Sequence, residues 1–217
     1  MYTEGEIDIL VSFCKETFDL PHEKLSDEYY YQSIPLCIID AVYSIGIRYE
    51  ITQKVLRKYC DYYKLKRIRD NERRLPEIQG QHSVDNLLEN LDKFNLDFEN
   101  IADTLFTKNR TSSRNGILKA EAVYHFARKL QKYNINYFQD INKFTVNDLR
   151  LENDIKAIKG QTSGISLKYF FMLCGSENLI KPDRMILKFI IERINRNIDA
   201  VNATNILRAV CTKLNVE

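Results

Sequence analysis

The chain has 217 residues, of which 44% are hydrophobic and 29% charged, and its formal net charge is +2. This length and composition are typical of a globular protein with one large domain or two small lobes. No stretch approaches the roughly 20 apolar residues of a membrane-spanning helix, and the acidic first residues lack the basic start of a secretory signal. We therefore expect no membrane association and a cytoplasmic location.

Apolar residues recur every three or four positions along almost the whole chain, and only 7 glycines and 4 prolines interrupt them. This periodicity predicts an all-α protein. The predicted helices, in chain order, are Glu6–Phe18, Pro35–Ile45, Ile51–Tyr63, Val84–Asp92, Asn100–Phe106, Ile117–Tyr133, Val146–Ile155, Ile165–Cys174, Arg184–Arg196 and Ala203–Leu214. The predicted N-terminal caps, each a side-chain acceptor before an apolar run, are Asp97, Ser113, Thr145 and Thr204.

Two segments are rich in basic residues: basic side chains outnumber acidic ones from Lys54 to Arg74, and no acidic residue lies between Lys108 and Lys119. Each segment can bind phosphates, and each can equally be a solvated face. The second segment includes a polar loop, residues 107–116, which is rich in hydrogen-bond donors and can contact a ligand. A solvated loop is the alternative.

The five cysteines predict neither disulfides nor a metal centre. They are odd in number, widely spaced and set mostly among apolar residues, which is typical of reduced thiols in a core. No pair has the close spacing of a zinc or iron–sulfur ligand set, and the three histidines are scattered. We therefore expect no metal and no other cofactor.

The segment 158–190 has the most specific pattern. Gly160 and Gly164 punctuate a turn between two predicted helices, where backbone N–H groups at a helix start can bind a phosphate. Further on, Pro182 and Asp183 directly precede another apolar helix. Taken alone, an aspartate at this position is more typical of a helix cap than of a catalyst.

This segment resembles the helix-hairpin-helix, followed by a loop and an aspartate, of the DNA glycosylase superfamily that includes endonuclease III. Residues 158–160 match the start of the hairpin, Gly175 the end of its second helix, Asp183 the aspartate and Lys188 a basic residue five positions later. The resemblance implies that Asp183 is the catalytic carboxylate. It also implies that the DNA backbone is bound by Lys159, Gly160, Thr162, Gly164 and Lys188.

Three departures from the family pattern limit this resemblance. Thr162 stands in place of the second hairpin glycine, which predicts a reshaped phosphate-binding turn. Gly164 occupies the position where bifunctional members have the lysine that attacks the sugar, which predicts a monofunctional enzyme, although other nearby lysines leave lyase activity open. Only Cys211 follows Asp183, so the iron–sulfur cluster loop of many relatives is not expected here.

Upstream, the segment 33–49 resembles the helix and turn with which the family wedges side chains into the duplex. We interpret Tyr43, Arg48 and Tyr49 as wedge or base-pocket residues, and two core helices joined at a glycine are the alternative. Asn109 and Arg110 of the polar loop 107–116 are interpreted as further contacts to a base or to the duplex. The resemblance further implies two helical lobes with the active-site cleft between them. Residues 21–176, with the hairpin at about 156–175, would form one lobe, and residues 1–20 with 177–217 the other.

The expected function is therefore that of a monofunctional DNA glycosylase. Such an enzyme flips a modified or damaged base out of double-stranded DNA and hydrolyses its N-glycosidic bond, leaving an abasic site. The expected partner is duplex DNA, bound by a monomer. The sequence does not identify the base: repair, and defence against phage with hypermodified DNA such as glucosylated hydroxymethylcytosine, are both compatible with it. A non-catalytic helix-hairpin-helix DNA-binding module is the main alternative, and a helical protein-interaction adaptor is another.

Overall fold

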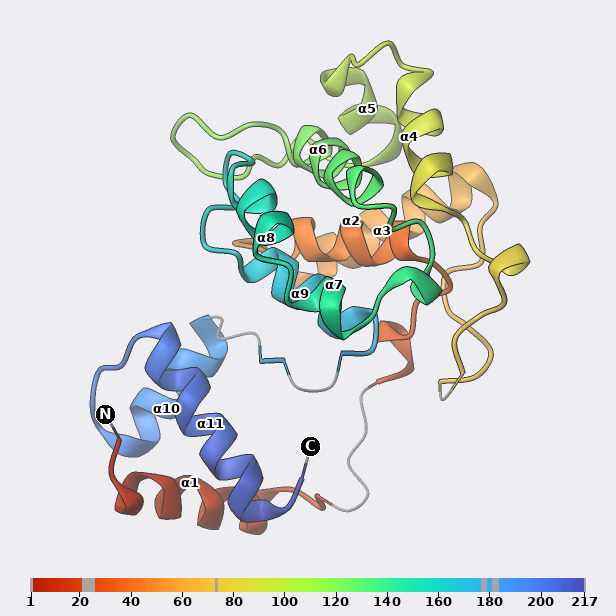
Figure 1. The fold of residues 1–217 in the computed structure, drawn as a ribbon. Coiled ribbons are helices and arrows are strands. Elements are labelled where there is room, and N and C mark those ends of the chain that lie inside the picture. The colour runs from red at the N-terminus through yellow and green to blue at the C-terminus, as the bar shows by residue number, and fades with distance from the viewer. Residues whose placement is uncertain (1, 21–25, 73, 177–178, 181–183, 217) are drawn as a thin grey trace. The chain divides into compact units, whose positions relative to one another are not determined.

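The computed structural model describes residues 2–20, 26–72, 74–176, 179–180 and 184–216. Over these residues the regular secondary structure consists of the helices α1 to α11, three single-turn 3-10 helices and two isolated β-bridges (Figure 1). The all-α prediction is thus confirmed for the part of the chain that is described. None of the described helices is long and apolar enough to cross a membrane.

The chain divides into two units: unit 1 is Met1–Leu25 with Glu177–Glu217, and unit 2 is Ser26–Ser176. The helices of unit 1 are α1 (Glu4–Thr17), α10 (Arg184–Ile194) and α11 (Ala200–Leu214). Those of unit 2 are α2 (Ile34–Tyr43), α3 (Tyr49–Tyr63), α4 (Val84–Asp92), α5 (Phe98–Leu105), α6 (Lys119–Lys132), α7 (Lys143–Val146), α8 (Leu149–Lys156) and α9 (Ile165–Leu173), with 3-10 turns at Asp27–Tyr29, Ile78–Gly80 and Phe138–Asp140.

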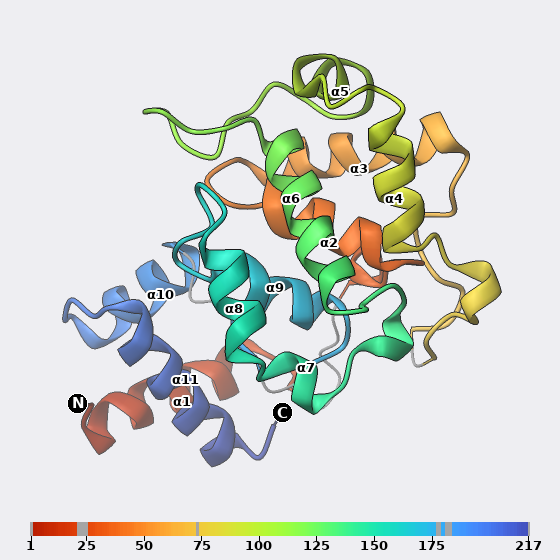
Figure 2. The same ribbon diagram turned by 45° about the horizontal axis from the view of Figure 1, so that its top comes forward.

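Helix α2 is the centre of unit 2. All of its residues are buried, and it packs on α3, α6 and α9, among which it lies in Figure 2. A helix that is apolar on every side, rather than along one stripe, must be surrounded by other elements. The apolar run that begins at Ile34 is therefore the core around which the other helices of this unit assemble.

Unit 1 has its own small core. Leu10 and Val11 of α1 pack with Ile190 of α10 and with Ala203, Ile206 and Val210 of α11. At the rim, the guanidinium of Arg196 donates to the Glu6 carboxylate at 2.7 Å, and this hydrogen bond lowers the pKa of Glu6 to about 2. Segments from opposite ends of the chain are thus joined by apolar contacts and by an ion pair.

The predicted N-terminal caps were correct at one helix and wrong at three positions. Asp97 accepts the Asn100 N–H at 3.1 Å at the start of α5, as predicted. Ser113 was wrong as a cap, because the chain from residue 107 to 118 forms a loop and α6 begins only at Lys119, with Leu118 as its N-cap. Backbone pairings between the two ends of the loop hold it, such as the Lys119 N–H that donates to the carbonyl of Asn109 at 2.8 Å.

Thr145 and Thr204 were also wrong as caps, because both lie inside helices. Thr145 belongs to the short α7, and Asp148 caps the following α8 by accepting the Arg150 N–H at 2.8 Å. The predicted helix Val146–Ile155 thus corresponds to α8, which begins three residues later, at Leu149. At α11 the cap is Asp199, which accepts the Asn202 N–H at 2.7 Å.

Candidate nucleic-acid interface

Helices α8 and α9 are joined by a turn, residues 157–164, in which both glycines have a left-handed backbone. The φ angle is +88° at Gly160 and +70° at Gly164. The Gln161 N–H donates to the carbonyl of Ile158 at 2.9 Å, and the Gly164 N–H donates to the carbonyl of Gln161 at 3.0 Å. The chain thus passes through two successive tight turns, which need glycine because other L-residues rarely adopt these angles.

The N-terminus of α9 has no side-chain cap. Its N-cap residue is Gly164, and Ser163 offers only a long contact, 3.4 Å, to the Ile165 N–H. The first N–H groups of a helix carry the positive end of its dipole, so an anion is stabilised at such an end. Lys159 on the turn and Lys168 on α9 are exposed nearby, and neither pairs with an acidic group among the described residues.

The turn packs closely on the loop 107–118. A methyl group added to Gly160 would lie 2.3 Å from Thr111 Cβ, so the Thr111 side chain packs directly against the Gly160 backbone. The loop is closed by the bridge between Arg110 and Leu118 and by the Thr111 N–H, which donates to the carbonyl of Ile117 at 2.9 Å. Two segments predicted to bind DNA thus lie side by side, on one side of unit 2 (Figure 2).

The polar side chains of this loop are tied to the protein. The Arg110 guanidinium donates to the carbonyl of Gly116 at 3.0 Å and pairs with Glu99 of α5 at 3.3 Å. Lys108 pairs with Asp103 of α5 at 2.7 Å. Asn109 accepts the hydroxyl proton of Thr107 at 2.7 Å. The acidic groups on α5 therefore offset part of the positive charge that the sequence predicts for this loop.

Lys119, the last residue of the second basic segment, does not lie on the surface, so it neither binds phosphates nor belongs to a solvated face. Its side chain is only 1% exposed. The ammonium donates to the carbonyls of Val42 and Tyr43, both at 2.9 Å, and of Ile45 at 2.6 Å. Lys119 thus satisfies the last carbonyls of α2 and places a positive charge at the negative end of that helix dipole.

The three residues predicted around the α2–α3 turn differ in accessibility. Tyr43 is fully buried, and its hydroxyl donates to the carbonyl of Thr107 at 3.2 Å, so its ring is part of the core. Arg48 is exposed at the N-cap of α3. Tyr49 is half-buried and stacks on Tyr29, with ring centroids 5.4 Å apart. Of these three predicted residues, Arg48 and Tyr49 are the accessible ones.

The sequence analysis missed a buried carboxylate behind Tyr49. Asp40 is fully buried and accepts hydrogen bonds from the hydroxyls of Tyr31 at 2.7 Å, Tyr169 at 3.4 Å and Ser44. Burial, and then the negative charge of Asp40, raise the pKa of Tyr31, Tyr169 and Tyr49. The available signal was a single acid within the otherwise apolar run of α2.

The remaining predicted residues lie elsewhere. Thr162 is exposed on the α8–α9 turn. Lys188 is exposed on α10 in unit 1, where its ammonium pairs with Glu192 at 3.7 Å. Asp183 lies outside the described residues, so its assignment as the catalytic carboxylate stays a prediction.

Comparison with known proteins gives one match. A family model described as "Domain of unknown function (DUF8548)" matches residues 8–217, which is almost the whole chain. No curated protein and no solved structure matches the chain.

Proposed function

Since the chain belongs to the family described as a domain of unknown function (DUF8548), we propose a function from its own residues: a monofunctional DNA glycosylase that holds duplex DNA at the α8–α9 turn. The proposal combines the resemblance to the helix-hairpin-helix glycosylases with the geometry of this turn. Its substrate would be a modified or damaged base, and its product an abasic site.

The observation that supports the proposal best is the uncapped N-terminus of α9, which follows two left-handed glycines. A DNA phosphate placed there would accept hydrogen bonds from the first N–H groups of the helix. The exposed ammonium groups of Lys159 and Lys168 add charge that attracts the DNA backbone.

Asp183 is the proposed catalytic carboxylate. In the proposed reaction the bond between the base nitrogen and C1′ breaks, and its electron pair leaves with the base. The ionised carboxylate stabilises the positive charge that develops on the sugar, and it accepts a proton from the water that attacks C1′. No lysine is needed for this hydrolysis, which agrees with glycine at position 164.

The first test is base release from duplexes that carry oxidised, alkylated, mismatched or glucosylated hydroxymethylcytosine bases. Abasic sites are scored as strand breaks after alkali. We expect the wild type to act on at least one duplex and Asp183→Asn to lose the activity. Asp199→Asn is the matched control, because Asp199 also precedes a helix of unit 1 and an asparagine retains its cap.

The second test is DNA binding as a function of salt. Lys159→Gln and Lys168→Gln should each weaken binding and lower the salt slope by about one. Lys143→Gln, on α7, is the control for an exposed lysine outside the turn. Salt-dependent binding without base release from any duplex would favour the non-catalytic DNA-binding module. Strand breaks without alkali would contradict the monofunctional assignment.

A further inference from the structure

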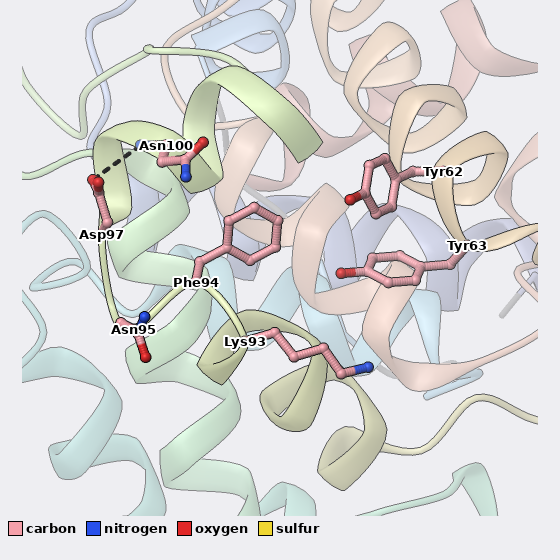
Figure 3. A pocket seen from close by; sticks show the side chains of 7 residues that line it. All are labelled: Tyr62, Tyr63, Lys93, Phe94, Asn95, Asp97 and Asn100. Atoms are coloured by element: carbon pink, nitrogen blue, oxygen red, sulfur yellow. Dashed lines mark hydrogen bonds between the residues drawn. The ribbon is translucent and has the colours of Figure 1, made fainter.

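A pocket of about 740 Å³ opens between the C-terminus of α3 and the connection from α4 to α5, and none of its lining residues belongs to the candidate nucleic-acid interface (Figure 3). Tyr62 and Tyr63 line one side, and their hydroxyls point toward the ring of Phe94. Asp97 and Asn100, at the start of α5, lie on the other side of Phe94. The volume falls within the range of about 300 to 1,000 Å³ that is usual for small-molecule sites.

The tyrosines of this pocket are held in place by rings that extend from the core. Tyr59 is buried and stacks on Phe106 with centroids 5.6 Å apart, and it contacts Tyr63 at 5.1 Å. Tyr63 in turn contacts Tyr62 at 4.9 Å. Tyr62, the last ring of this series, is 53% exposed. The pocket thus presents a fixed aromatic surface that a planar ligand can cover without reordering the protein.

Polar groups at the rim supply hydrogen-bond donors, one positive charge from Lys93 and one negative charge from Asp97, whose Oδ1 accepts the Asn100 N–H. Lys93 donates to Asn90 Oδ1 at 3.0 Å, has two further protons, and pairs with no acidic group among the described residues. The Asn100 side-chain carbonyl accepts the Thr104 hydroxyl proton at 3.0 Å, so its amide NH₂ stays available. Aromatic rings beside an amide and an ammonium match a planar heterocycle that bears an anionic group.

The surface next to the pocket is basic. Lys54, Lys58 and Tyr62 follow one another at intervals of four residues along the exposed face of α3, and Arg57 is exposed beside them. Glu50, four residues before Lys54 in the same row, and Asp61 are exposed acidic residues of α3, and the Lys58 ammonium also donates to the carbonyl of Phe106 at 3.1 Å. A chain of phosphates that lay along α3 would therefore meet positive charge and then reach the tyrosines of the pocket.

We propose that this pocket binds a nucleotide, with its base stacked on Tyr62 and facing Phe94 and its phosphate near Lys93. The nucleotide can be free, or it can be an unpaired nucleotide within a nucleic-acid strand, because both present the same base and phosphate. The proposal is independent of the glycosylase activity, since it uses different residues and requires no reaction.

The test uses the fact that the chain has no tryptophan. Tyr62→Trp keeps a stacking ring and introduces a unique fluorophore at an exposed position. Deoxynucleoside monophosphates and a short oligothymidylate are titrated against it separately, and we expect saturable quenching of the introduced indole by at least one of them. Phe144→Trp is the matched control, because Phe144 is an exposed aromatic residue, 79% accessible, on α7.

Second substitutions in the Tyr62→Trp protein locate the ligand. Phe94→Ala should weaken binding about tenfold, as expected for loss of a stacking partner. Lys93→Gln should weaken binding of the nucleotide by a similar factor and leave binding of the corresponding nucleoside unchanged. These variants change half-buried or exposed side chains, and circular dichroism verifies that they fold.

The titrations distinguish the two sources of the ligand. Saturation by a free monophosphate assigns a free nucleotide, and saturation by the oligothymidylate alone assigns a nucleotide within a strand. Quenching by neither ligand, or equal quenching in the Phe144→Trp control, would overturn the proposal. An oligonucleotide of abasic residues that quenched as strongly as oligothymidylate would overturn it too, because binding would then not involve the base.

Discussion

Replacing Gly160 by alanine should separate the α8–α9 turn from the loop 107–118. The new methyl carbon would lie 2.3 Å from Thr111 Cβ and 2.5 Å from Thr111 Oγ1, while the backbone at φ +88° disfavours any side chain. The left-handed conformation costs about 1 to 2 kcal/mol for alanine, and overpacking adds about 1 to 3 kcal/mol. We therefore expect Gly160→Ala to lower the free energy of unfolding by about 2 to 5 kcal/mol, measured by urea denaturation followed by circular dichroism.

Gly175→Ala separates the two contributions. Gly175 also has a positive φ, +94°, but an added methyl group would meet nothing within 4 Å. This variant should show only the conformational cost of about 1 to 2 kcal/mol. In addition, Thr111→Gly should reduce the effect of Gly160→Ala, because it removes the atoms that collide. If Gly160→Ala were no more harmful than Gly175→Ala, the contact between the turn and the loop would be refuted.

Lys119→Met should lower the free energy of unfolding by about 3 kcal/mol or more, because the carbonyls of Val42 and Tyr43 in α2, and of Ile45 just after it, lose their donor. A loss below about 1 kcal/mol in urea denaturation would contradict this role. His82 should contribute to acid sensitivity, because burial lowers its pKa to about 4 from 6.5. The unfolded chain then binds a proton that the native chain does not, so stability present above pH 6.5 is lost as the pH falls toward 4. His82→Gln should reduce the loss between pH 7 and pH 5 by about 1 to 2 kcal/mol, and equal losses in both proteins would refute the assignment.

The apolar periodicity predicted a helix well where a capping residue next to it in sequence marks its boundary. The predicted helix Val84–Asp92 has the observed bounds, and Ser83 caps it by accepting the Asn86 N–H at 3.0 Å. The prediction failed at Asn147 and Asp148, because apolar residues on both sides continue the helical spacing through the break. A cap that forms within three residues can be identified from sequence, but the choice between two competing caps depends on tertiary packing.

The candidate interface was predictable in part. Glycines at 160 and 164 indicated an unusual turn, and both have positive φ. The role of Lys119 was not predictable, because its hydrogen-bond acceptors lie on α2, far away in sequence. The same holds for Asp40, whose partners Tyr31 and Tyr169 come from separate parts of the chain. A charged side chain is buried at low cost only when it forms hydrogen bonds with donors or acceptors that are distant in sequence. The residues next to it in sequence do not predict those partners.

The attachment of Lys119 to α2 has a consequence for the order in which the protein folds during synthesis. The carbonyls that end α2, those of Val42 and Tyr43, receive their donor from a residue 77 and 76 positions later in the chain. Helices α2 to α5 therefore emerge from the ribosome before Lys119 can donate to the carbonyls of α2. Water must hydrate the C-terminus of α2 until α6 has been synthesised. Until then α2 lacks this donor and the packing of α6, and it lacks the packing of α9 for longer still, so its apolar surface stays open to aggregation on the nascent chain.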